Sequence, residues 1–541
     1  MMNKRAQSCV AEVGTLLAPL LAILWMMREA LKTRTTHLWG PEDPWANNDW
    51  VGNLWMWWRT AEAEKGVEWN SQIVWPTGGG DLNAVFPNRV DAWIAAPWVD
   101  VEQLASWWNG QALLHIGLTA LSIALILRLS GRSRLATVLA ATYALSSPIW
   151  LHELAGGRMA TFVVWPGLLS LAVVIAETAS QKTRLGASAV GGALCALQFL
   201  AYPFYGLCTA MICTAAVLTR KVPMRERLMH VLVMGVFCAV ICLPTLLTWT
   251  QAFESAESMP PPAGYTSLSI QGALGFSDLP GRFQVAPGFL LLVLAGLLLP
   301  SARIWVVITA LVTGFALGPS VLWAPGISSG LLGPMHMLNE ASDTLRRMHH
   351  PIRLMPFALA TGAVAIAHLI DRARTQMPPG RAPFISVFVF IILAGSPTLK
   401  DGISWEGAPI PEGTEGARFV AQRAGPVAHI TQREHGGLAH QIWHRRPVLA
   451  STQGFAFPPD KQPSDKQRAL TRSILSIRAG TAISASIATL QAAGVKTLLL
   501  TASANPGGQA FLAERRASLL PILGTPRFVD DTAIVFALDP P

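Results

Sequence analysis

Apolar residues fill most of the first 395 positions in blocks of roughly 15–22 residues, separated by polar connectors. A helix of about 20 apolar residues crosses the roughly 30 Å hydrocarbon layer of a bilayer. The blocks therefore predict a polytopic α-helical membrane protein with about eleven transmembrane helices. The expected spans are 10–27, 110–128, 134–150, 162–178, 187–202, 204–219, 230–249, 286–300, 303–321, 354–370 and 384–395.

Basic residues lie mainly in every second connector. They are Arg128, Arg132, Arg134, Lys182, Arg184, Arg220, Lys221, Arg225, Arg227, Arg303, Arg372, Arg374 and Arg381. Because cytoplasmic connectors are enriched in Lys and Arg, this alternation predicts a cytoplasmic N-terminus and an extracytoplasmic C-terminal end. Arg28, Lys32 and Arg34 follow the first block and depart from the pattern, but they open a long loop, where positive charge is better tolerated.

The first outer loop, residues 28–109, contains no expected span but is rich in tryptophan. Its indoles are Trp39, Trp45, Trp50, Trp55, Trp57, Trp58, Trp69, Trp75, Trp93, Trp98, Trp107 and Trp108. Indole rings favour the membrane–water interface, where the ring is buried and the N–H stays hydrated. We therefore expect helices lying along the outer membrane surface.

Residues 396–541 have the composition of a soluble domain, so residues 1–395 are assigned to the membrane domain. Short runs typical of strands alternate with helical patterns, which predicts a C-terminal α/β domain outside the membrane. The expected strands are 426–430, 447–450, 495–500 and 533–538, and the expected helices are 465–478, 484–493 and 509–520.

Composition agrees with a membrane location. Apolar residues make up 51% of the chain and charged residues only 13%, whereas soluble proteins carry about 25% charged residues. The net charge of +9 would suit nucleic acid binding in a soluble protein, but membrane topology explains these basic residues better, and we expect no nucleic acid partner. The six cysteines show neither a disulfide framework nor a paired metal spacing.

Two aspartates lie near the start of the first outer loop. Asp43 and Asp49 lie among tryptophans, in the segment Trp39-Gly40-Pro41-Glu42-Asp43 and in Asn47-Asn48-Asp49-Trp50. Partial desolvation raises the pKa of a carboxylate toward the range in which it works as a general base. The structural alternative is that both residues cap a surface helix, because Asp is a common N-cap.

A cationic segment precedes the tenth span, on the same predicted side. Arg346, Arg347 and Arg353, with His349 and His350, could hold a lipid phosphate or diphosphate, because guanidinium groups bind phosphate oxygens bidentately. They would also stabilise charge that grows on a phosphate leaving group. Attraction to lipid headgroups without catalysis is the alternative explanation.

Two shorter outer connectors also carry candidate substrate contacts. His152, Glu153 and Arg158 lie close together in sequence and could contact a substrate or form a mutual salt bridge. They are not a metal motif, because no second ligand follows at helical spacing. Tyr202 and Tyr205 lie in a tight outer turn, for which the sequence favours a structural role, although the two tyrosines could stack against a sugar.

The first loop resembles that of the GT-C superfamily of integral membrane glycosyltransferases, uncharacterised bacterial members included, which use polyprenyl-phosphate-linked sugars as donors. The resemblance rests on Asp49-Trp50 to Trp57-Trp58, on Trp75-Pro76-Thr77-Gly78-Gly79 and on Ala96-Pro97, together with the many spans and the C-terminal outer domain. It implies that Asp49 is the catalytic carboxylate, with Asp43 second. Asn47-Asn48-Asp49 stands where the family usually has an adjacent acidic pair.

The resulting hypothesis is transfer of a sugar from a polyprenyl-phosphate donor to an acceptor at the outer face of a bacterial cytoplasmic membrane. A lipid-linked saccharide flippase or transporter is one alternative, although the span interiors hold few charges and the sequence shows no repeat. A non-catalytic assembly factor for envelope polysaccharide is another. No cofactor is assigned, and a divalent metal requirement, the sugar, the acceptor and the oligomeric state stay open.

Overall fold

The computed structural model describes residues 4–40, 48–63, 90–150, 154, 157, 162–180, 185–219, 222–254, 267–275, 285–341, 350–376, 408–410, 412–432, 437–450 and 464–538. Helices occupy ten of the eleven apolar blocks. They are α1 (Lys4–Met26), α6 (Leu104–Leu129), α7 (Arg134–Leu145), α9 (Trp165–Ser180), α10 (Leu185–Ala201), α11 (Pro203–Leu218), α12 (Met224–Glu254), α14 (Phe289–Ala295), α15 (Arg303–Ala316) and α18 (Met355–Gln376). The block at 384–395 lies outside the described residues.

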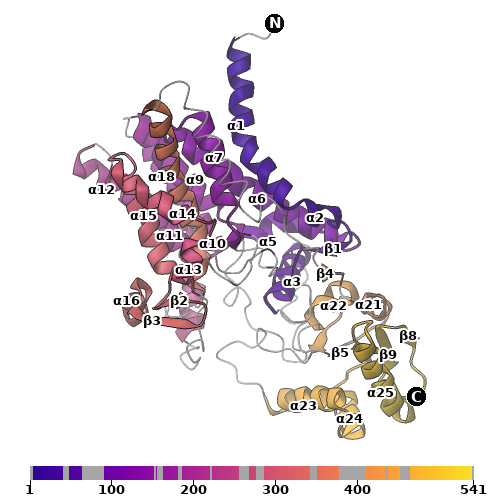
Figure 1. The fold of residues 1–541 in the computed structure, drawn as a ribbon. Coiled ribbons are helices and arrows are strands. Elements are labelled where there is room, and N and C mark those ends of the chain that lie inside the picture. Colours follow the sequence, from indigo (N-terminus) through magenta and orange to yellow (C-terminus); the bar gives the residue numbers. More distant parts are fainter. Residues whose placement is uncertain are drawn as a thin grey trace.

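The helices form one bundle, with α18 among its most buried members (Figure 1). Four helical segments of the described chain are long and apolar enough to cross a membrane: Gln7–Met26, Leu104–Leu129, Met224–Leu247 and Pro351–Gln376. Large apolar side chains cover outward surfaces; Val10, Leu232 and Val240 are each at least 60% exposed. Such surfaces are expected to face lipid. The full count of about eleven crossings stays a prediction.

The basic connectors meet at one end of the bundle, which we call the basic end. Glu12 of α1 accepts hydrogen bonds from Arg128, at the end of α6, and from Arg134, at the start of α7. Arg132 lies 3.5 Å from Asp371 of α18. Charged contacts at this end thus join α1, the connector between α6 and α7, and α18, which are far apart in sequence. Which side of the membrane this end faces stays a prediction.

Ser320–Ala324 and Ile327–Leu332 form an antiparallel hairpin, β2 and β3. The expected span 303–321 is therefore too long, since α15 ends at Ala316 and the hairpin begins four residues later. Pro325 and Gly326 make the turn, and Gly326 has φ +77°, a conformation that glycine adopts without strain. A short helix, α16 (Pro334–Ala341), follows the hairpin.

The C-terminal region contains a five-stranded sheet with the order β6-β5-β7-β9-β8. Strands β5 (Val427–Thr431), β6 (Val448–Ala450) and β7 (Thr497–Thr501) are parallel, whereas β9 (Ala533–Ala537) is antiparallel to β7 and to β8 (Phe528–Val529). Helices α21 (Thr414–Ala421), α22 (Gly437–His444), α23 (Asp465–Ala479), α24 (Ile483–Ala492) and α25 (Pro506–Leu523) accompany it. The expected strands and helices of this region all occur near their predicted positions; α21, α22 and β8 were not predicted.

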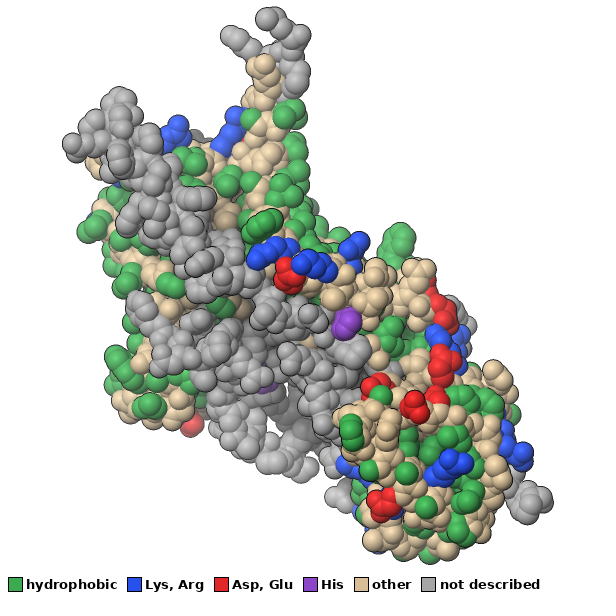
Figure 2. Space-filling model, turned by 45° about the vertical axis from the view of Figure 1, so that its right-hand side comes forward, with side chains coloured by type: hydrophobic (Ala, Val, Ile, Leu, Met, Phe, Trp, Pro, Cys, Tyr) green, Lys and Arg blue, Asp and Glu red, His purple; other side chains and the backbone are tan. Residues whose placement is uncertain are grey.

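The C-terminal region packs directly on parts of the first loop (Figure 1). Strand β1 (His37–Leu38) pairs with β4 (Ala408–Pro409), and Arg418 of α21 forms a 2.7 Å ion pair with Glu102. Figure 2 shows acidic and basic side chains concentrated over this region, in contrast to the apolar surface of the bundle. The described parts of the first loop and the C-terminal region are therefore in direct contact, and which side of the membrane they occupy stays a prediction.

Candidate active site at the loop end

The helix that carries the candidate base Asp49 at its second position is α3 (Asn48–Ala63). Asn and Asp at the first positions of a helix favour its start. Their side-chain oxygens can accept hydrogen bonds from free backbone N–H groups, and a carboxylate is attracted to the positive end of the helix dipole. Residues 53–58 are all buried, so this helix is enclosed on every side over that stretch. It packs on α5 (Val90–Ala95) on one side and on α22 on the other. Asp49 is therefore carried at the start of a helix clamped between the loop and the C-terminal region.

Among the described side chains of α3 and α6, the indoles of Trp55, Trp57, Trp58, Trp107 and Trp108 are buried in protein, which corrects the expectation that they lie in the membrane interface. Trp39, Trp57, Trp58 and Trp108 are fully buried. Three of these N–H groups have protein acceptors: Trp39 donates to Ala30 O, Trp57 to Asp91 Oδ2 and Trp108 to Trp39 O. The C-terminal region and α6 supply the apolar cover that the sequence interpretation assigned to lipid. Trp93 and Trp98 are exposed, and for these two a location at the membrane interface stays a prediction.

Asp91 of α5 is a buried carboxylate that the sequence interpretation did not single out. Trp57 Nε1 donates to its Oδ2 at 3.0 Å, and Oδ1 has no hydrogen-bond partner in the described part of the chain. Desolvation raises the pKa of Asp91 to about 7, and the hydrogen bond from Trp57 opposes that rise. A single Asp has no spacing to other polar residues that would mark it as functional. The usable signal was a charged residue within the apolar run Val90-Asp91-Ala92-Trp93.

Arg353 and Tyr202 come together from distant parts of the sequence. Arg353 lies in the 3₁₀ turn Pro351–Leu354 before α18, and Tyr202 lies between α10 and α11. Arg353 Nη1 donates to the Tyr202 hydroxyl at 3.1 Å, and its guanidinium carbon lies 5.7 Å from the centre of the tyrosine ring. Tyr205 packs edge-on against Tyr202 at 4.7 Å and against Phe357 at 5.4 Å. The guanidinium is thus oriented by an aromatic group.

A short path of contacts connects α3 with Arg353. Trp57 of α3 bonds Asp91 of α5. The adjacent residue, Val90, shares an apolar cluster with Leu200 and Ala201 of α10, which directly precede Tyr202. The acidic Trp-rich helix and the arginine therefore belong to the same end of the bundle, which we call the loop end. The start of α6 also lies at the loop end, because the amide of Asn109 donates to Arg34 O and His37 O of the first loop at 2.7 Å.

Several predicted site residues lie outside what the structure describes. These are Asp43, His152, Glu153, Arg158, Arg346, Arg347 and His349. For Asp49 the helix is described but the side chain is not. His350 is half-buried and its carbonyl accepts the Arg353 N–H at 3.1 Å. Of the predicted groups, the structure brings together Arg353, Tyr202 and Tyr205. Among the described residues, no three His, Cys, Asp or Glu side chains gather as a metal site would require.

No protein-family model matches this sequence, and no curated protein matches it. Solved structures match in fold. AftD, an arabinofuranosyltransferase from Mycobacteria, gives a TM-score of 0.61 at 13% identity over 97% of this chain and 40% of its own. The apo oligosaccharyltransferase of Archaeoglobus fulgidus gives 0.56 at 12% identity over 91% of this chain and 69% of its own.

A third solved structure matches this chain over nearly its whole length. ArnT from Cupriavidus metallidurans, bound to undecaprenyl phosphate, gives a TM-score of 0.51 at 12% identity over 99% of both chains. At such identities the likeness establishes the fold, which is the one that the first-loop motifs indicated. This chain therefore has the fold of the GT-C superfamily of integral membrane glycosyltransferases.

Proposed function

We propose that this protein transfers a sugar from a polyprenyl-phosphate-linked donor to an acceptor hydroxyl, at the outer face of the cytoplasmic membrane. The observation that carries the proposal is the junction of Arg353 and Tyr202 at the end of the bundle where α3 also lies. An acidic helix and an oriented guanidinium at one end offer a base and a phosphate ligand within one site. The fold supports the same activity, since the similar structures are glycosyltransferases and one binds undecaprenyl phosphate.

In the proposed reaction Asp49 is the general base. Its carboxylate takes the proton of the acceptor hydroxyl while the hydroxyl oxygen attacks the anomeric carbon of the donor. The bond between that carbon and the phosphate oxygen breaks, and the electron pair leaves with the lipid phosphate. One bond forms and one breaks at the anomeric carbon, so a single displacement inverts its configuration. Asp43 is the second candidate for the base.

Arg353 stabilises the leaving phosphate. A guanidinium presents a planar set of N–H donors, and one of those on Arg353 is used to fix its orientation on Tyr202. Preorganised donors are worth most where negative charge grows in the transition state. Arg346 and Arg347 precede this residue in sequence and are proposed as further phosphate ligands. His349 and His350 complete the proposed cationic segment, and His152, Glu153 and Arg158 are proposed sugar or acceptor contacts.

Asp91 and Trp57 position the base rather than react. Their hydrogen bond joins α3 to α5, and α22 closes the other side of α3. Fixing a catalytic group within a fraction of an ångström of its reactive geometry is worth several orders of magnitude in rate. The C-terminal region is accordingly proposed to hold α3 in place, in addition to any role in acceptor binding.

The test is a transfer assay on the full chain in lipid nanodiscs, with radiolabelled polyprenyl-phosphate sugar and membrane extract as the acceptor source. Asp49→Asn is expected to lower transfer at least about 1,000-fold, because the amide cannot accept the proton. Asp531→Asn, an exposed carboxylate in the C-terminal region, is the matched control and should leave transfer unchanged. Assays with and without a chelator address the metal requirement.

Normal transfer by the Asp49→Asn protein would remove Asp49 from the mechanism, and Asp43→Asn would then be assayed in the same way. Label that crosses the bilayer of sealed proteoliposomes without reaching a new acceptor would instead indicate a flippase. An intact protein with no transfer and no movement of label would favour the assembly-factor alternative.

A further inference from the structure

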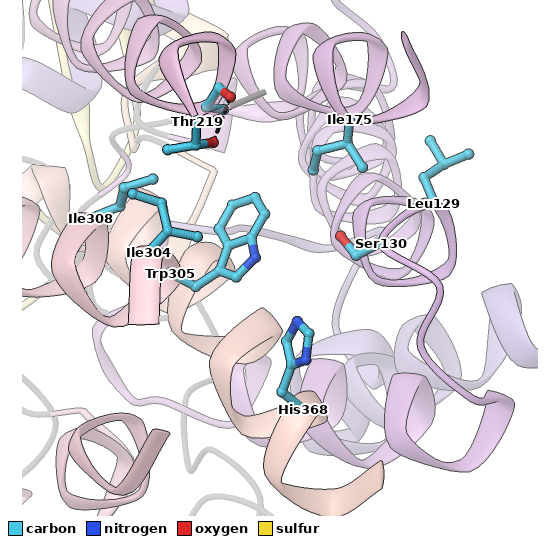
Figure 3. Close-up of a pocket in the computed structure, with 9 residues that line it drawn as sticks. Leu129, Ser130, Ile175, Thr219, Ile304, Trp305, Ile308 and His368 are labelled. Carbon is cyan, nitrogen blue, oxygen red and sulfur yellow. Dashed lines mark hydrogen bonds between the residues drawn. The ribbon is translucent and has the colours of Figure 1, made fainter. Parts of the chain in front are cut away.

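A cavity lies at the basic end, away from the candidate active site. Its volume is about 240 Å³, and it is bounded by α6, α9, α11, α15 and α18 (Figure 3). The volume falls just below the usual range for pockets that enclose a whole small molecule. It suits one polar group with the first few atoms of a chain.

The cavity has apolar walls and a polar end. Ile175, Ile304 and Ile308 form the walls with Ala216, whereas Ser130 and His368 lie together at the polar end (Figure 3). The hydroxyl of Ser130 donates to Ile126 O, so the lone pairs of the Ser130 oxygen can accept hydrogen bonds from other groups. Such a distribution matches an amphiphile better than a fully polar solute.

His368 presents an N–H donor to the cavity. Its imidazole is buried, and Nδ1 accepts a 2.8 Å hydrogen bond from Arg132 Nη1. Because the arginine can only donate, Nδ1 must be the unprotonated nitrogen, and the proton of the ring then resides on Nε2. Within the described chain no group is hydrogen-bonded to Nε2. In Figure 3 the ring extends from α18 toward Trp305.

Trp305 supplies a second donor. Its indole projects from α15 into the middle of the cavity (Figure 3), and its Nε1 has no hydrogen-bond partner in the part of the chain that the structure describes. Arg132, directly behind His368, adds positive potential. Asp371, 3.5 Å from Arg132, compensates part of that charge. Two N–H donors backed by a guanidinium fit an oxyanion.

We propose that this cavity binds a phosphate-bearing membrane lipid from the leaflet at the basic end. The phosphate accepts hydrogen bonds from His368 Nε2 and Trp305 Nε1, and the first part of the chain lies between α9 and α15. Thr219 at the rim is exposed, and the neighbouring side chains Leu218 and Val307 are exposed apolar groups on the bundle surface. The remainder of the lipid can therefore continue into the bilayer without crossing a polar surface.

The inference does not depend on the sugar-transfer proposal, because no residue of the cavity belongs to the loop end. The test uses the full chain in nanodiscs with a phosphatidic acid that carries a diazirine near its acyl carbonyl. After irradiation and digestion, adducts are expected on peptides of α9 and α15. Trp305→Phe combined with His368→Phe should lower this labelling at least about tenfold, since the loss of even one hydrogen bond to a charged group weakens binding by about that factor.

Trp323→Phe is the matched control, because Trp323 is an exposed indole on β2 and should leave labelling unchanged. A second variant, Ala216→Phe, fills the cavity from α11 and keeps both donors; it should also abolish the adducts. Competition separates the possible ligands. Unlabelled phosphatidic acid should displace the probe, whereas diacylglycerol and inorganic phosphate should not.

Three outcomes would overturn the proposal. Undiminished labelling of the double variant would show that the donors are irrelevant. Displacement by diacylglycerol would reduce the site to an apolar crevice, and displacement by inorganic phosphate would make it a site for the free ion. Thermal unfolding of every variant is measured in parallel, so a loss of label with an unchanged melting temperature is attributed to the cavity.

Discussion

Trp55 Nε1 of α3 donates a 2.8 Å hydrogen bond to Gln441 Oε1 of α22, and both side chains are buried. The amide of Gln441 in turn donates to Arg446 O, so its orientation is fixed. Glu62 and Arg445 form a 3.6 Å ion pair beside this bond. The helix that carries Asp49 is therefore fastened to the C-terminal region by specific polar contacts as well as by apolar packing.

Replacing Gln441 by Ala is expected to lower the free energy of unfolding by about 1–3 kcal/mol, because Trp55 Nε1 is left buried without an acceptor. The change should also speed proteolysis of the C-terminal region. Gln422→Ala, at an exposed position of the same region, is the control. Equal melting temperatures for the two variants in detergent would contradict the importance of this contact.

Arg353→Lys should lower sugar transfer about 100-fold while the protein stays folded. An ammonium group keeps the charge but loses the planar donor set that binds phosphate and stacks on Tyr202. Tyr202→Phe removes only the 3.1 Å hydrogen bond, so a loss of about tenfold is expected. Transfer rates at saturating donor measure both effects, and a larger loss for Tyr202→Phe than for Arg353→Lys would refute this order.

The stability of the protein should decrease as pH rises toward neutrality, through Asp91. Its pKa is raised by burial to about 7, so the folded state holds a proton that the unfolded state releases above about pH 4. The contribution of protonated Asp91 to the free energy of unfolding is complete below the unfolded pKa. It is lost as the pH rises to about 7, by at most about 4 kcal/mol. Asp91→Asn should remove this dependence, seen as a melting temperature that rises relative to wild type between about pH 5 and about pH 8. Asp531→Asn should follow wild type.

Acid should destabilise the C-terminal region through His444. Burial, together with His440 and Arg446, lowers the pKa of this imidazole to about 3. The unfolded state takes up a proton below about pH 6.5 and the folded state does not, so stability is lost as pH falls from 6.5 toward 3. Between about pH 6.5 and about pH 4.5 the loss reaches about 3 kcal/mol at most.

His444→Gln should reduce this acid sensitivity, because the amide oxygen can accept the 3.1 Å bond from the Arg446 N–H and does not titrate. Hydrogen exchange of β5 and β7 at the two pH values provides the measurement. An acid response in the variant as large as that of wild type would exclude His444 as its source.

Close packing of α10 on α12 should make Gly192 intolerant of any side chain. A Cβ atom there would lie 2.4 Å from Met234 O, and helix backbone cannot yield as a side chain can. Gly192→Ala is expected to cost about 1–3 kcal/mol. Gly186→Ala on the same helix meets nothing within 4 Å and should stabilise by about 0.5–1 kcal/mol. Melting temperatures that move the same way would disprove this packing.

The apolar blocks predicted the bundle helices well because lipid requires long, continuous helical runs, whose signal is local. The β2–β3 hairpin was absorbed into an expected span because Val321 and Leu322 extend the apolar block, although Pro325-Gly326 marked the turn. The alternation of basic connectors predicted that the connector with Arg132 and the one that begins at Arg372 lie on one side, and Arg132 does lie 3.5 Å from Asp371, the residue before Arg372.

The site was harder to predict because its contacts join distant segments. Arg353 and Tyr202 were each singled out from their connectors, but nothing local in the sequence predicts their 3.1 Å hydrogen bond. The burial of Trp55 could not be foreseen without knowing that α22 covers it. Asp91 escaped notice for the same reason, since its environment is made by Trp57, more than thirty residues away.

The bond between Trp55 and Gln441 joins residues 386 positions apart. Ribosomes add roughly 5–20 residues per second, so the emerging first loop waits for its cover on the order of 20–80 s. During that interval several large indoles lack their final neighbours. Insertion machinery or a chaperone at the membrane surface is expected to shield them, and a chain truncated before Gly437 should be degraded even when all its spans are inserted.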